Sequence, residues 1–123
     1  MKFARTVFLA AGLWGFLVLT PLYFMEQTIG QQSPPAVTHP EYYYGFLGVS
    51  LAWQVLFLLL ASDPARYRPV MIPAILEKIS FVLAGFVLYG TGRVAATMAV
   101  FAGLDLLWAV LFVVAFLKTG HRA

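Results

Sequence analysis

The chain has 123 residues, of which 62% are hydrophobic and only 11% charged, and its mean hydropathy is +0.86. This composition lies far outside that of a soluble domain, and four apolar runs of about 20 residues, the length of a membrane span, use up almost the whole chain. The absence of cysteine excludes disulfides, thiol catalysis and cysteine-ligated clusters. The net charge is +3, and the positively charged residues lie singly around the ends of the runs. This distribution argues against a nucleic-acid-binding surface.

The first apolar run, residues 6–25, follows two basic residues as the hydrophobic region of a signal peptide would. No small-residue cleavage motif comes after it, so we expect it to form the first membrane span. Ala11 and Gly15 are spaced to let another helix approach closely, and Pro21 is expected to bend the outer third of the span.

Residues 26–41 are rich in Gln, Gly, Ser and Pro and are predicted to form an exterior loop. Three prolines are expected to fix extended backbone there, namely Pro34, Pro35 and Pro40. Residues 42–61 are predicted to form the second span. It begins with tyrosines suited to a membrane interface, Tyr42, Tyr43 and Tyr44.

The third and fourth spans are predicted at residues 70–91 and 94–117. Pro69 suits the first position of the third helix, because its missing N–H would have no intrahelical partner there. Pro73 follows four residues later. It leaves open the alternative that the chain up to this proline lies at the interface and the span starts just after it.

Positive charges predict the orientation of the bundle. Six Lys and Arg residues fall on the side of the termini and the middle turn, against one on the other side: Lys2, Arg5, Arg66, Arg68, Lys118 and Arg122 against Arg93. On the positive-inside rule both termini should be cytoplasmic. The fold class is therefore predicted to be an all-α integral membrane four-helix bundle with up-down topology, forming one transmembrane domain.

Glu77 and Lys78 stand side by side inside the third run, where an ionisable side chain costs about 2.5 to 3.5 kcal/mol and is by default a candidate functional site. At about 1.5 Å per residue, they and Gln54 lie roughly 12 to 14 Å from the cytoplasmic ends of their helices, and Asp105 lies about 20 Å from its own. Two serines lie between these levels, and three tryptophans lie at about 13 to 15 Å. These residues are Ser50, Ser80, Trp14, Trp53 and Trp108.

Helical spacing places most of these residues on three faces, each of which combines polar groups with small or aromatic residues. The faces are Ser50 with Trp53 and Gln54, Glu77 with Ser80 and Ala84, and Asp105 with Trp108 and Ala109. We expect them to meet at the centre of the bundle, where carboxylate, amide, hydroxyl and indole groups can satisfy one another.

Lys78 diverges from its neighbour Glu77 by about 100° around the helix, so it is expected either to reach Asp105 or to extend to the cytoplasmic surface. Two buried carboxylates with one ammonium carry net negative charge, and one carboxyl is expected to hold a proton at neutral pH. The polar layer therefore has three interpretations. It holds the helices in register, it binds a ligand or relays protons, or it lies in the headgroup zone if the third span starts late.

His39, Glu41 and Glu26 could form an exterior metal site, but two ligands at i and i+2 beside a proline are a weak pattern. No histidine lies inside a span, which excludes a membrane haem held by paired histidines. The sequence also has no Ser-His-Asp set, phosphate-binding glycine loop or zinc-protease motif. We therefore predict no metal and no cofactor.

Four segments together carry a resemblance: HPEYYYGFLGVSLAWQ, DPARYRP, AILEKISF and the later Asp105. With them the chain resembles a group of uncharacterised small bacterial membrane proteins with four helices. The resemblance implies a bacterial inner membrane location and carries over no catalytic residues. In size the chain is also similar to the small multidrug resistance exporters, which place a glutamate in the middle of the first helix. No glutamate lies between Arg5 and Glu26 here.

The leading functional hypothesis is a non-enzymatic inner-membrane bundle that serves as an accessory subunit or binds a small apolar or lipid-like molecule. Small-residue faces favour packing against further copies or a larger complex. The alternative is a proton-coupled transporter in which Glu77 or Asp105 exchanges its proton for substrate. A membrane enzyme acting on lipid or quinone is the third hypothesis.

Overall fold

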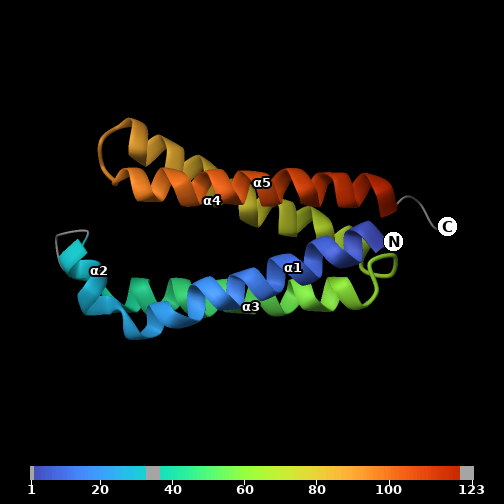
Figure 1. Ribbon diagram of the computed structural model, residues 1–123, viewed down its shortest axis with the longest axis horizontal. Coiled ribbons are helices and arrows are strands. Elements are labelled where there is room, and N and C mark those ends of the chain that lie inside the picture. The colour runs from blue at the N-terminus through green and yellow to red at the C-terminus, as the bar shows by residue number, and fades with distance from the viewer. Residues whose placement is uncertain (1, 33–36, 120–123) are drawn as a thin grey trace.

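The computed structural model describes residues 2–32 and 37–119, and all regular secondary structure in this part of the chain is helical (Figure 1). Its elements are α1 (Lys2–Leu19), the 3₁₀ segment η1 (Thr20–Phe24), α2 (Glu26–Gln32), α3 (Pro40–Ser62), the 3₁₀ segment η2 (Arg68–Val70), α4 (Met71–Gly90) and α5 (Ala96–Thr119). Four stretches are long and apolar enough to cross a membrane: Lys2–Phe24, Pro40–Ser62, Arg68–Gly90 and Ala96–Thr119. The all-α class is thus confirmed for the described residues, and the four stretches support a multi-pass membrane protein by their length and composition.

The segment predicted as a loop, residues 26–41, contains the short helix α2. Its Glu and Gln residues are good helix formers, and Glu26 in the first turn complements the helix dipole. The hydroxyl of Tyr44 also donates to Glu26 Oε1 at 2.9 Å. Pro40 begins α3 instead of fixing extended backbone, because its φ suits the first helical position equally well. Pro34 and Pro35 lie outside the described residues.

Prolines shape the ends of the first and third spans. The α-helical part of the first span ends at Leu19, and the chain continues through Pro21 as a 3₁₀ turn, since this proline cannot donate to the helical ladder. Pro73 lies in the first turn of α4. Backbone N–H groups in a first turn have no partner within the helix, so a proline there costs no hydrogen bond. The helical stretch therefore runs without a break from Arg68 to Gly90.

The four long helices pack as two pairs, α1 with α3 and α4 with α5. In the first pair, a Cβ atom on Gly12 would lie 2.7 Å from Leu58 Cδ2, so the two backbones approach closely only because this position lacks a side chain. In the second pair, a Cβ atom on Gly85 would lie 2.7 Å from the Cβ atom of Ala102.

The two pairs join around one aromatic core at the end of the molecule where α1 starts and α5 finishes. The rings of Phe8 and Phe112 stack with centroids 4.4 Å apart, and Phe57 packs edge-on against Phe112 at 5.1 Å. The other members of this buried cluster are Ala4, Val7, Ala11, Leu60, Ala61, Met71, Ala74 and Ala115. We call this the joined end. Towards α2 and the α4–α5 turn, the open end, the pairs diverge (Figure 1).

Candidate functional site

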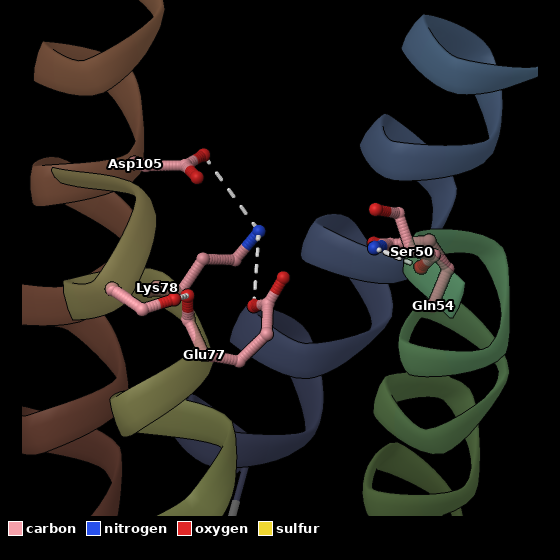
Figure 2. A network of polar contacts seen from close by, with 6 residues as sticks. Ser50, Gln54, Glu77, Lys78 and Asp105 are labelled. Atoms are coloured by element: carbon pink, nitrogen blue, oxygen red, sulfur yellow. Dashed lines mark hydrogen bonds and ion pairs between the residues drawn. The ribbon is translucent and has the colours of Figure 1, made fainter. Parts of the chain in front are cut away.

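Three charged side chains meet on α4 and α5. The Nζ atom of Lys78 lies 3.8 Å from Glu77 Oε2 and 3.7 Å from Asp105 Oδ1 (Figure 2). The Lys78 side chain is only 8% exposed, against 20% for Glu77 and 21% for Asp105. We call Glu77, Lys78 and Asp105 the charged triad. One buried ammonium group thus forms ion pairs with two carboxylates.

The charged triad also faces the other helix pair. Lys78 Nζ lies 5.2 Å from the centre of the Phe57 ring on α3, within range of a cation–π contact. Phe57 belongs to the aromatic core, so the triad lies next to this core. Within the described residues, Glu77 Oε2 is buried and accepts no hydrogen bond.

Lys78 reaches both carboxylates because its side chain is long. Glu77 is its neighbour in sequence, and the spacing left open whether the two would pair directly. In the structure their side chains bend towards one another. Asp105 was expected to lie deeper than Lys78. The four-carbon stem of the lysine spans this difference, as Figure 2 shows. Lys78 therefore makes the contact with Asp105 and does not extend to the surface.

Gln54 does not join the charged triad, contrary to the expectation of one shared layer. It is 2% exposed and lies against Gly15 of α1, in the contact within the first pair. Its Nε2 donates to the carbonyl oxygen of Ser50 at 2.8 Å, while its Oε1 is buried without a partner among the described residues. Figure 2 shows Ser50 and Gln54 on α3, across from the triad. The amide fits into this contact because Gly15 has no side chain.

The remaining predicted residues surround the site without entering it. Ser80 is exposed, and its hydroxyl donates to the backbone oxygen of Glu77 at 2.9 Å. Trp53 and Trp108 are partly buried and pack against the aromatic core. Trp14 is 37% exposed and is not among the residues that pack against the aromatic core. The tryptophans therefore form no common cage.

The weak pattern of metal ligands at His39, Glu41 and Glu26 is not assembled into a site in the described part of the chain. His39 Nδ1 lies 3.4 Å from Glu41 Oε1, but Glu26 is engaged by Tyr44 instead. Among the described residues no group of three or more metal-ligating side chains occurs.

A shallow groove of about 490 Å³ lies on α3 towards the open end. Its lining residues are Glu41, Tyr42, Gly45, Phe46, Val49 and Ser50. Tyr42, Phe46, Ser50, Trp53 and Phe57 repeat every three or four residues and so form one stripe along α3. At the joined end this stripe packs against the other pair through Phe57. At the open end the same stripe is uncovered and lines the groove.

Sequence reasoning singled out neither Phe57 nor the groove. A usable signal was present, because Phe57 and Phe112 each follow a tryptophan by four residues, which continues an aromatic face on their helices. Which two aromatic faces meet depends on how the helices pair, and spacing within one helix does not give that.

The structure thus offers two separate candidate features, the charged triad on α4 and α5 and the groove on α3. No known protein family, curated protein or solved structure matches the chain.

Proposed function

We propose that this chain is a multi-pass protein of the bacterial inner membrane that binds a small apolar or lipid-like molecule without changing it chemically. The other form of this proposal is a non-enzymatic accessory subunit, which assembles with further copies of the chain or with a larger membrane complex.

The aromatic stripe of α3 is the observation that carries this proposal. Over Trp53 and Phe57 the stripe is covered by protein, whereas over Tyr42 and Phe46 it lines the groove. Tyr42 is 70% exposed and Phe46 is 50% exposed. The groove is open and lined by α3 alone, and it places the polar groups of Glu41 and Ser50 beside apolar side chains that a lipid-like molecule can contact.

Gly45 provides a test of the groove, because a Cβ atom built on it meets nothing within 4 Å. In Gly45→Leu the new side chain should occupy the groove without disturbing a neighbour. Gly103→Leu on α5 is the matched control, since a Cβ atom there also has open space. Native mass spectrometry of the purified proteins should detect a bound small molecule in the wild type and in Gly103→Leu, and lose it in Gly45→Leu.

Retention of the same molecule by Gly45→Leu would contradict binding in this groove. Repeated absence of any bound molecule from wild-type protein prepared in several mild detergents would contradict the binding function itself. A partner complex that co-purifies with the wild type, with no small molecule present, would favour the accessory-subunit form of the proposal.

The orientation that we propose places both termini in the cytoplasm. The chain contains no cysteine, so single cysteines can report on it directly. Ser62→Cys at the joined end and Gln31→Cys in α2 are both exposed positions. In intact cells a membrane-impermeant maleimide should label Gln31→Cys, and it should label Ser62→Cys only after permeabilisation. The reverse pattern would contradict this orientation.

A second candidate function is proton-coupled transport, and the charged triad favours it. Two carboxylates share one ammonium, and Glu77 Oε2 is buried without a hydrogen-bond donor in the described part of the chain. Such a carboxylate can exchange a proton for a cationic group on a substrate.

Vesicles containing the purified protein and a pH-sensitive dye test this second function. Transport should produce a substrate-dependent proton flux that Glu77→Gln and Asp105→Asn abolish without loss of folded protein. If these substitutions change only thermal stability, and the wild type shows no flux, the triad is structural.

A further inference from the structure

The joined end carries a second charged site, which is built around Arg68. The Nε atom of Arg68 donates to the carbonyl oxygen of Phe116 at 3.1 Å, and its guanidinium carbon lies 3.8 Å from the centre of the Phe116 ring. Phe116 is in the last turn of α5, where backbone carbonyls have no intrahelical partner. The arginine therefore caps the end of α5 and is held in place by two contacts with one residue.

Most of the hydrogen-bonding capacity of Arg68 is unused by these contacts. A guanidinium has five N–H donors in a planar fork, and the bond to Phe116 uses one of them. Over residues 2–32 and 37–119, no carboxylate or carbonyl oxygen accepts from its terminal nitrogens, and no acid forms an ion pair with it. A fork that is fixed in position with free terminal donors is suited to bidentate binding of a phosphate group.

Further positive charge surrounds this arginine. Lys118 follows Phe116 by two residues, and its Nζ lies 4.7 Å from the centre of the Phe3 ring on α1. Arg66 precedes Arg68 by two residues and lies over the ring of Tyr67. The only acid in this turn is Asp63, whose side chain accepts from the backbone N–H of Arg66. The corner formed by η2, the start of α1 and the end of α5 is therefore strongly positive.

Apolar surface lies next to this positive corner. Leu117 on α5 is 68% exposed and Ile72 on α4 is 50% exposed. Leu117 directly follows Phe116, and Ile72 lies four residues after Arg68. A ligand with a phosphate and acyl chains would satisfy both surfaces, whereas inorganic phosphate would satisfy only the first.

We propose that Arg68 binds the phosphate of an anionic phospholipid in the leaflet at the joined end, with Arg66 and Lys118 adding charge attraction. The site is independent of the groove on α3 and of the function proposed for it. A basic residue near an anionic membrane surface contributes about 1 kcal/mol to lipid attraction, which corresponds to about a five-fold change in affinity.

Titrations of detergent-solubilised protein with phosphatidylglycerol, or with phosphatidylcholine of the same acyl chains, test this proposal by native mass spectrometry. Wild-type protein should bind phosphatidylglycerol more tightly, and Arg68→Gln should weaken that binding about five-fold or more. Arg68→Lys, which keeps the charge but loses the fork, should fall between them. Arg93→Gln, an exposed arginine at the open end, should bind like the wild type.

Three results would overturn the proposal. One is equal binding of phosphatidylglycerol by wild type and Arg68→Gln. Another is equal weakening by Arg93→Gln, which would indicate diffuse charge attraction. The third is displacement of the lipid by millimolar inorganic phosphate, which would indicate a free-anion site. If Arg68→Gln fails to fold, Arg68→Lys still decides the question, because wild-type affinity in that variant would exclude a role for the fork.

Discussion

The side chain of Gln54 fills the space that a methyl group on Gly15 would occupy. Both the Cγ atom and the amide group of Gln54 overlap this position, so the whole side chain lies over the glycine. The amide is kept there by its bond to the Ser50 carbonyl oxygen at 2.8 Å. These two residues therefore set how closely α1 and α3 approach each other.

Gly15→Ala should therefore destabilise the protein by about 1 to 3 kcal/mol, the usual cost of adding a group to a packed interior. Gly45→Ala is the matched control, because it makes the same change in a helix where the new methyl group meets nothing within 4 Å. It should be neutral or stabilising by up to about 1 kcal/mol. Unfolding in mixed detergent micelles measures both free energies.

The variant Gln54→Ala tests whether the cost of Gly15→Ala comes from the contact with this glutamine. In the double variant with Gln54→Ala the space above position 15 is open, so Gly15→Ala should cost much less than it does in the wild type. Equal costs of Gly15→Ala in both backgrounds would contradict the contact between these two residues.

Removal of the shared ammonium should be among the most damaging single changes. Lys78→Met leaves Glu77 and Asp105 without a countercharge, and breaking a buried ion pair in this way costs about 3 to 5 kcal/mol. The free energy of unfolding in micelles measures this loss.

Neutralising all three members of the charged triad provides the control for Lys78→Met. The combination Glu77→Gln, Lys78→Met and Asp105→Asn should restore most of the lost stability, because no buried charge is then unpaired. A single variant Lys78→Met as stable as the wild type would show that the three groups are not coupled as their distances imply.

The aromatic core at the joined end should hold the two helix pairs together. Phe112→Ala removes a ring that is fully buried and stacks on Phe8, so it should cost about 3 to 5 kcal/mol. Phe24→Ala is the control, because Phe24 is 87% exposed and its loss should change stability by less than about 0.5 kcal/mol. Similar effects of the two substitutions on thermal unfolding would contradict this position of the core.

The sequence predicts the helices well because their main signal is apolar length. Four helical stretches long and apolar enough to cross a membrane are found, and Pro69 lies at the start of its helical stretch as anticipated. The helix in residues 26–32 was missed, because nearby prolines and a glycine indicated a loop. Its Glu and Gln residues and the contact with Tyr44 outweigh that signal.

The candidate site could be predicted only in part. Spacing along one helix gives the faces on which Gln54, Lys78 and Asp105 lie, but not the helix that each face meets. Gln54 is on the side of α3 that packs against Gly15, so it lies within the first pair, while Lys78 and Asp105 meet within the second. The Arg68 contact with Phe116 joins residues 48 positions apart and leaves no periodic pattern in the sequence.

Site-specific photo-crosslinking in native membranes tests most directly whether the groove on α3 binds a small molecule. A benzoylphenylalanine in place of Phe46 lies in the groove, and one in place of Leu17, which is 70% exposed on α1, serves as the control. After illumination, mass spectrometry of the intact protein should show one enriched small-molecule adduct at position 46. Position 17 should give only the mixture of bulk lipids, and the same mixture at both positions would contradict a binding groove.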